Sequence, residues 1–107
     1  MSLDVEYTLD AKHEIREVYL WIQAHLPQAA EHWRDELIEK VDLLAEAARS
    51  HPPIPERAKF KEEVRQFLHG RRRGQYRVIY MVEETRVIVL TVRHSSRAPL
   101  KEGDLPI

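Results

Sequence analysis

Two runs of β-branched and aromatic residues, separated by four residues, constrain the fold of this chain most strongly. The runs are Tyr76–Val82 and Val87–Val92, and Glu83–Arg86 joins them. Residues of this kind favour strands, and so short a connection brings consecutive strands together as an antiparallel hairpin. Both runs are almost continuously apolar, which is typical of strands buried on both faces. We therefore predict that this hairpin forms the centre of a sheet.

Two amphipathic segments lie before this hairpin. The first follows possible helix N-caps at Thr8 and Asp10, and its apolar residues recur at helical spacing: Leu9, Ile15, Val18, Tyr19, Leu20, Trp21, Ile22 and Leu26. Pro27 ends this helix or opens the next. The second helix carries its apolar stripe at Ala30, Trp33, Leu37, Val41, Leu44 and Ala48. The short connection predicts an antiparallel helical hairpin. Trp21 and Trp33 could hold this hairpin together or form a partner surface, of which we favour the first.

The other segments complete the predicted order of elements. Leu3–Tyr7 alternates apolar and polar residues and predicts a short strand, and Ser50–Pro55 predicts an extended connector. Val64–Leu68 fits a helix or a strand, of which we favour the strand. Gly70–Gly74 predicts a turn. The expected fold is α+β with the order β-α-α-β-β-β: a small antiparallel sheet with the helical hairpin packed on one face.

Length and composition set further bounds. The 107 residues suffice for one domain, which we expect at residues 1–97, followed by a loose tail at residues 98–107 that contains two prolines and one glycine. The sequence has no cysteine, which excludes a disulfide scaffold, a thiol nucleophile and an iron–sulfur cluster, and fits a cytoplasmic protein. No apolar stretch is long enough to span a membrane. The histidines lack the spacing of metal ligands, so we expect neither a metal nor a cofactor.

Charge is unevenly distributed along the chain. Residues 1–56 carry 12 acidic and 5 basic residues, whereas residues 57–107 carry 6 acidic and 12 basic residues, nine of them arginine. Arginine suits bidentate contact with phosphate or carboxylate groups, so the second half predicts an anionic partner. We expect the sheet face opposite the helices, with its rim, to gather the arginines that would bind a nucleic acid or a protein partner: Arg65, Arg71, Arg72, Arg73, Arg77, Arg93 and Arg97.

Three sequence motifs and the order of elements resemble a known family. The motifs are Val64-Arg65, Tyr76-Arg77-Val78-Ile79-Tyr80 and Val92-Arg93-His94-Ser95-Ser96-Arg97, and the resemblance spans residues 3–97. It is to the RelE/ParE superfamily of toxins from type II toxin–antitoxin systems. The resemblance implies a growth-inhibiting toxin that a cognate antitoxin neutralises in a hetero-oligomer. RelE-like members cleave mRNA in the ribosomal A site, and ParE-like members inhibit DNA gyrase.

The resemblance leaves the mechanism open. Metal-independent RNA cleavage needs a proton-transfer group and cations around the phosphate. Arg77 and Arg97 match the family as catalytic candidates for charge stabilisation, with Arg65 as a third. His94, at the end of the last strand, is the catalytic candidate for proton transfer. RelE-like nucleases often carry a tyrosine just beyond the last strand, but Arg97–Lys101 contains none. We therefore favour a toxin that only binds its target, and keep a ribosome-dependent endoribonuclease and an inactive interaction module as alternatives. An acidic, apolar antitoxin segment would be held by Arg65 together with Arg77 and Arg97.

Overall fold

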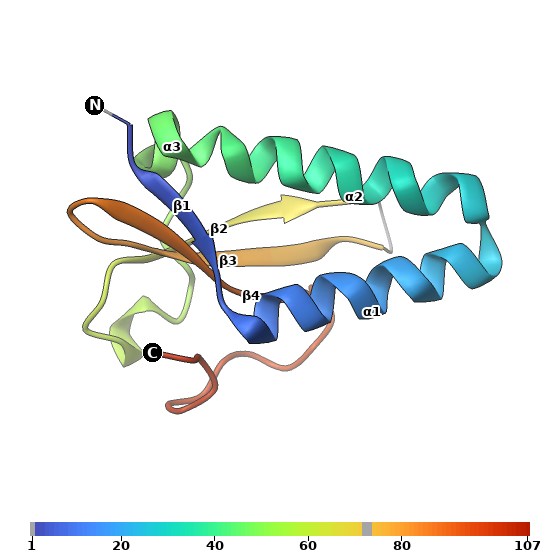
Figure 1. The fold of residues 1–107 in the computed structure, drawn as a ribbon. Coiled ribbons are helices and arrows are strands. Elements are labelled where there is room, and N and C mark those ends of the chain that lie inside the picture. Colours follow the sequence, from blue (N-terminus) through green and yellow to red (C-terminus); the bar gives the residue numbers. More distant parts are fainter. Residues whose placement is uncertain (1, 72–73) are drawn as a thin grey trace.

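The predicted helical hairpin and strands form in the order expected. The computed structural model describes residues 2–71 and 74–107. Along the chain the elements are β1 (Asp4–Tyr7), α1 (Leu9–His25), α2 (Pro27–Asp42), α3 (Leu44–Ala47), η1 (Ala48–Ser50), η2 (Arg57–Lys59), β2 (Val64–His69), β3 (Tyr76–Val82) and β4 (Arg86–His94). Figure 1 shows α1 and α2 running antiparallel along one side of the sheet. The α+β class and the assignment of β2 as a strand are confirmed.

Local chemistry fixes the ends of the helices. Thr8, one of the two expected N-caps, accepts a hydrogen bond from the Ala11 amide at 3.0 Å and donates its hydroxyl proton to the Leu90 carbonyl at 2.8 Å. The cap therefore also ties the start of α1 to β4. Pro27 opens α2 at its first turn, where the missing N–H costs nothing.

The sheet has the strand order β1-β4-β3-β2 and is mixed. The last three strands form the expected antiparallel meander, and the β3–β4 hairpin is central. The expectation of a wholly antiparallel sheet is wrong for β1, which runs parallel to β4 with Asp4 opposite Arg86. The α1–α2 hairpin brings the chain back toward the beginning of β1 before β2 starts. β1 pairs with the edge of β4 that faces away from β3.

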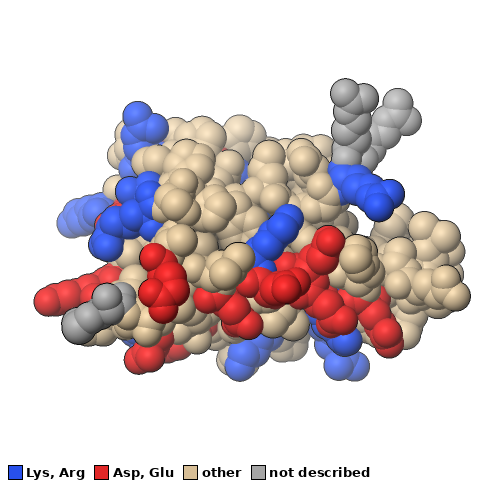
Figure 2. Space-filling model, turned by 90° about the horizontal axis from the view of Figure 1, so that it is seen from above, with Lys and Arg blue, Asp and Glu red and all other residues tan. Residues whose placement is uncertain are grey.

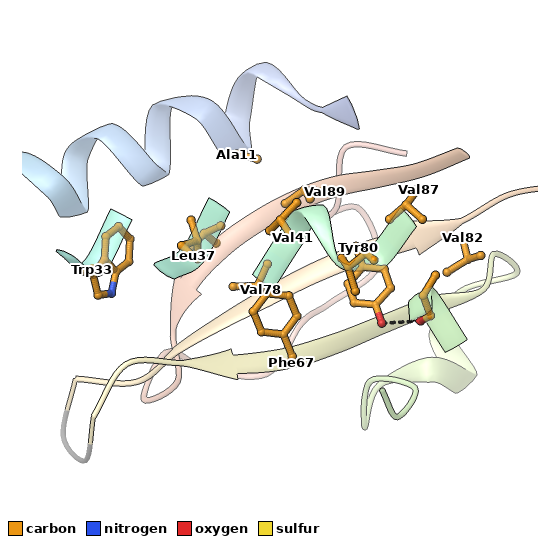
Figure 3. Packing of buried hydrophobic residues seen from close by; sticks show 13 residues of the cluster. Ala11, Trp33, Leu37, Val41, Phe67, Val78, Tyr80, Val82, Val87 and Val89 are labelled. Carbon is orange, nitrogen blue, oxygen red and sulfur yellow. Dashed lines mark hydrogen bonds between the residues drawn. The ribbon is translucent and has the colours of Figure 1, made fainter. Parts of the chain in front are cut away.

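The main core lies between the helices and one face of the sheet. Leu37 and Val41 of α2 pack against Val78, Tyr80 and Val89 of the central strands (Figure 3). The buried Tyr80 hydroxyl donates a 2.6 Å hydrogen bond to the Ala48 carbonyl, so the ring joins the sheet to η1. Burial of these apolar side chains supplies the main driving force for the packing of the helices.

A second core covers the opposite face of the sheet. Ile79 and Leu90 of the central strands pack there with Ile54 of the connector and with Leu100 and Leu105 of the C-terminal segment. Leu100 and Leu105 are 0% and 6% exposed, so the expectation of a loose tail is wrong. The prolines and the glycine shape an irregular path, and the two leucines anchor it. This anchored segment places the C-terminus beside the second face (Figure 1).

Candidate functional site

A buried ion pair dominates the second face of the sheet. The Arg77 guanidinium donates from Nη2 to Glu56 Oε1 at 2.7 Å and from Nη1 to Glu56 Oε2 at 3.0 Å. Its Nε donates to Gln66 Oε1 at 2.7 Å. The side chains of Arg77 and Glu56 are only 9% and 8% exposed. Glu56 thus already occupies the bidentate edge of Arg77 that an external carboxylate or phosphate would use.

Glu56 also holds the C-terminal segment. Its Oε2 accepts the Leu100 amide proton at 2.8 Å, and Lys59 Nζ donates to the Leu100 carbonyl at 2.8 Å. Burial by itself would raise the pKa of Glu56, but the hydrogen bonds from Arg77, Leu100 and its own amide outweigh that effect and lower the pKa from 4.5 to about 2. One carboxylate therefore joins the connector, β3 and the C-terminal segment.

Arg93 and Arg97 lie on the same side of the sheet as Arg77. Arg93 is opposite Arg77 in the β3–β4 register and is 7% exposed, and its Nε has no hydrogen-bond partner among the residues that the structure describes. Burial, followed by the nearby Arg97 charge, lowers the pKa of Arg93. Arg97 is exposed and lines an open pocket of about 500 Å³ with Lys59 and Arg77. The pocket holds three cations and one carboxylate, Glu56.

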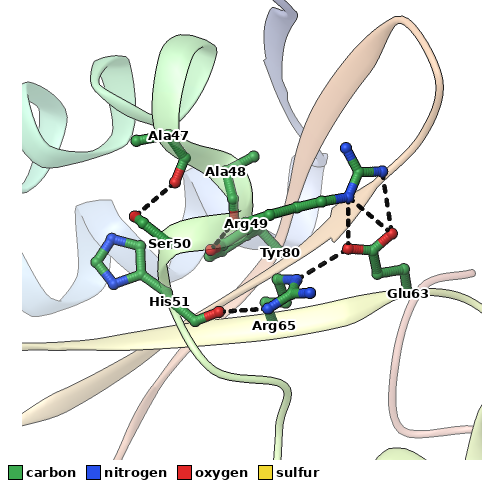
Figure 4. A network of polar contacts seen from close by, with 8 residues as sticks. All are labelled: Ala47, Ala48, Arg49, Ser50, His51, Glu63, Arg65 and Tyr80. Atoms are coloured by element: carbon green, nitrogen blue, oxygen red, sulfur yellow. Dashed lines mark hydrogen bonds and ion pairs between the residues drawn. The ribbon is translucent and has the colours of Figure 1, made fainter.

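Arg65 does not join this group, which corrects the prediction that it would share the face opposite the helices. It pairs with Tyr80 in the β2–β3 register and therefore points to the helix side of the sheet. Its Nε donates to Glu63 Oε2 at 2.9 Å and its Nη1 to the His51 carbonyl at 2.6 Å (Figure 4). Arg49 also pairs with Glu63 at 2.9 Å. Arg65 thus braces the connector against β2.

The three catalytic candidates do not meet at one point. His94 pairs with Tyr76, one register position from Arg77, and therefore points to the helix side. Its ring packs edge-on against Tyr76 at 5.2 Å, and its Nδ1 lies 2.6 Å from the Ser96 hydroxyl. Arg77 and Arg97 share the pocket on the opposite face. The sheet itself thus separates the imidazole from the two cations.

The β2–β3 turn places Arg71 in a different setting. Arg71 is exposed at the rim of an apolar groove, to which Trp21, Trp33 and Tyr76 contribute.

Trp33 is buried, as a residue that holds the helical hairpin together requires, but Trp21 is 62% exposed, so the prediction that both tryptophans staple the hairpin is wrong. Arg72 and Arg73, which we also predicted as binding residues, lie outside the described residues.

On the face that Figure 2 shows, acidic and basic side chains are not separated into two halves. Figure 2 views the molecule from above and shows the Asp and Glu side chains in a band along its length, with Lys and Arg side chains on both sides of the band. Within residues 2–71 and 74–107, no cluster of three or more His, Asp or Glu side chains is placed to hold a metal ion. None of the described helices is both long and apolar enough to span a bilayer.

Glu56, Gln66 and Lys59 belong to the pocket and were missed by sequence reasoning. One signal was present, because an acidic residue directly follows the Pro52-Pro53-Ile54-Pro55 segment. A rigid, proline-rich connector holds a side chain in place, and a carboxylate there is suited to pair with an arginine of the sheet. The periodicity of the strands placed Arg77 correctly but carried no information about its partner.

The comparison with protein families decides the affiliation of the chain. The family profile for the ParE toxin of the type II toxin–antitoxin system parDE matches residues 5–99. The chain belongs to the ParE toxin family. A solved structure entitled "Chromosomal ParDE TA system from P. aeruginosa" has a TM-score of 0.70 and 16% identity, covering 87% of this chain and 96% of that chain. At that identity the likeness concerns the fold. No curated protein matches the sequence.

Proposed function

We propose that this ParE-family toxin arrests growth by binding DNA gyrase, without cutting RNA, and that a cognate antitoxin neutralises it. One observation carries the choice of a binding mechanism: Arg77 and Arg97 lie on one face of the sheet, and His94 lies on the other. Proton transfer and charge stabilisation must act on the same phosphate within hydrogen-bond reach, which an intervening sheet prevents.

The pairing of Arg77 supports the same choice. Three of its hydrogen bonds go to Glu56 and Gln66 inside the protein, so it stabilises the fold. A cation that stabilises a transition state needs donors directed at the position where charge develops. Arg97 is exposed beside this pair, and we assign to it the contact with an anionic group of the target or of the antitoxin.

The endoribonuclease remains the second candidate because two arginines and one lysine line a single pocket. Such a pocket suits a phosphate group. The two mechanisms differ in their products: an endoribonuclease leaves shortened transcripts, whereas a gyrase inhibitor leaves relaxed plasmid DNA and intact transcripts. An inactive interaction module changes neither.

The test combines induced expression with two assays. Purified wild-type protein should inhibit supercoiling of relaxed plasmid by gyrase, and primer extension on mRNA after induction should show no new ends. Arg97→Ala should weaken the inhibition at least tenfold, whereas Arg16→Ala, which removes an exposed arginine from α1, should change it less than twofold. New mRNA ends that disappear in His94→Ala would overturn the binding mechanism. Growth unaffected by folded wild-type protein would favour the inactive module.

Neutralisation is tested separately by co-expression. The product of the short reading frame adjacent to the toxin gene should restore growth and elute with the toxin as a hetero-oligomer. If neither occurs for either neighbouring frame, the proposal of a cognate antitoxin fails, even where gyrase inhibition holds.

A further inference from the structure

The bend between α1 and α2 is apolar and exposed. Residues 18–30, which contain the bend, include no Asp, Glu, Lys or Arg, although 33% of the chain is charged. Figure 1 shows the bend projecting beyond the ends of the strands, and Leu20, Trp21 and Leu26 are 46%, 62% and 64% exposed there. Single apolar residues are normal on a protein surface, but several large ones in one patch mark an interaction site.

A hollow lies beside the exposed Trp21 ring in the same patch. It is the apolar groove described above, with a volume of about 350 Å³ and with Trp33 and Tyr76 in its wall. These two rings meet edge-on with their centroids 5.6 Å apart. The Trp21 ring packs against His25 at 4.4 Å, and His25 Nδ1 lies 2.7 Å from the Trp21 carbonyl oxygen, so the indole is held in place. A cavity of about 150 Å³ accepts benzene, so this groove has room for an indole ring.

The groove carries charges of both signs. Glu36 of α2 and Arg71 of the β2–β3 turn both line it, and both are exposed. Glu36 pairs with His32 at 3.0 Å within α2. The Arg71 guanidinium has no ion-pair partner among the residues that the structure describes. A partner that is wholly acidic or wholly basic would match only one of these two charges, whereas a second copy of the same patch matches both.

We propose that two copies of this chain associate through this patch, related by a two-fold axis. Trp21 of each copy enters the groove of the other, where it packs against Trp33 and Tyr76. Arg71 of each copy pairs with the partner's Glu36. An interface of this symmetry requires a surface that is complementary to itself, and the patch supplies both members of each contact, the ring with the groove and the base with the acid.

The dimer leaves the charged pocket on the second face open. Tyr76 of the groove packs against the main core on the helix side of the sheet, and Arg77, the next residue, lines the pocket on the opposite face together with Arg97. Each dimer therefore presents two such pockets. Self-association does not depend on the target that we propose for the toxin, and it adds a property to which that proposal makes no reference.

The test measures the mass of the purified full chain in solution as a function of its concentration. Sedimentation equilibrium should show one chain at low micromolar concentration and approach the mass of two chains at several hundred micromolar. Trp21→Ala should raise the dissociation constant at least tenfold, because a central tryptophan carries much of the binding energy of an interface. Leu9→Ala, which removes an exposed leucine from the other end of α1, should change it less than twofold. Circular dichroism checks that both variants are folded.

Charge reversal tests how the two copies are oriented. Glu36→Arg and Arg71→Glu should each weaken the dimer at least fivefold, because each places like charges together at both ends of the interface. The double variant exchanges the two charges and should restore the dissociation constant to within threefold of the wild-type value. A general loss of structure in the single variants would not be reversed in this way.

Fluorescence follows Trp21 itself, because the chain has two tryptophans and Trp33 is already buried in the single chain. Dimerisation should therefore reduce iodide quenching at least twofold. The proposal is overturned if the mass stays that of one chain at several hundred micromolar, if Trp21→Ala associates as tightly as wild type, or if the double charge variant associates no better than the single ones. It also fails if Trp21 is shielded only when the product of an adjacent reading frame is added. These readouts do not use gyrase or growth, so they stand or fall independently of the proposed function.

Discussion

Glu56→Ala should be the most damaging single substitution on the second face of the sheet. It leaves the Arg77 guanidinium, 9% exposed, without its counter-charge, and it leaves the Leu100 amide without its acceptor. Removing one partner of a buried pair typically costs about 3–5 kcal/mol, and we expect a loss of about 3 kcal/mol because the pair lines an open pocket. Urea unfolding followed by tryptophan fluorescence measures the change, since Trp33 is buried in the folded state.

A double-mutant cycle separates the ion pair from simple loss of packing. Glu56→Gln and Arg77→Met each leave one member of the pair without a matched partner, whereas the double variant removes both charges. We expect the double variant to be more stable than the sum of the single losses indicates, with a coupling energy of about 2 kcal/mol. Arg16→Met, on the exposed face of α1, is the control and should cost less than about 0.5 kcal/mol.

Acid should reveal the same interaction. The pKa of Glu56 is about 2 in the folded protein against 4.5 for the unconstrained side chain, so the folded state binds the proton more weakly. The associated stability is fully present above pH 4.5 and is lost as the pH falls toward 2, amounting to about 3 kcal/mol in all. Wild-type protein should therefore lose more stability than Glu56→Gln between about pH 5 and about pH 3. Equal losses, or a Glu56→Ala cost below about 1 kcal/mol, would refute the reasoning.

Three further predictions concern the framework around the site. Gly70→Ala should lower the free energy of unfolding by more than about 2 kcal/mol, because Gly70 has φ +106° and an added Cβ would collide with the Gly74 carbonyl oxygen. Gly103→Ala, at φ +87° in open space, should cost about 1 kcal/mol, and equal costs in urea unfolding would contradict the steric argument. Tyr80→Phe should lower the free energy of unfolding by about 1–2 kcal/mol, measured by thermal denaturation, because it leaves a buried carbonyl without its donor. Burial, with the Lys40 charge, lowers the pKa of His69, so the stability that neutral His69 provides is present above pH 6.5 and is lost as the pH falls. Between about pH 7.5 and about pH 5.5 the free energy of unfolding should therefore fall more for wild-type protein than for His69→Gln, and equal losses would contradict this.

Local patterns predicted the helices and the central hairpin well. Helical spacing placed Leu37 and Val41 in the core, and the β-branched runs placed β3 and β4 at the centre of the sheet. These features depend on periodicity and residue type alone. Leu9 was also placed on the apolar stripe of α1, yet it is 72% exposed, because it stands at the first turn of α1, where no element covers it.

The site was less predictable because it depends on contacts between distant segments. Arg65 precedes Gln66, which lines the pocket, so its side chain lies on the other face of β2. Only the β2–β3 register, in which Arg65 pairs with Tyr80, shows that this face is the one that the helices cover. The C-terminal segment is buried because Leu100 and Leu105 pack in one cluster with Ile79 on the second face of the sheet. The prolines and the glycine of this segment instead predicted a loose tail. The bond between Glu56 and Arg77 spans 21 positions of sequence. No repeat or spacing in the sequence encodes such pairs.

The parallel pairing of β1 with β4 has a consequence for biosynthesis. Residues 4–7 lie beside residues 86–89, so β1 is synthesised well before the strand with which it pairs. Pairings of such long separation form late, because the intervening chain must first be brought together. During translation α1 and α2 are synthesised before β3 and β4, so their apolar side chains at first have no sheet to pack against. The native sheet can therefore be completed only after β4 has been synthesised.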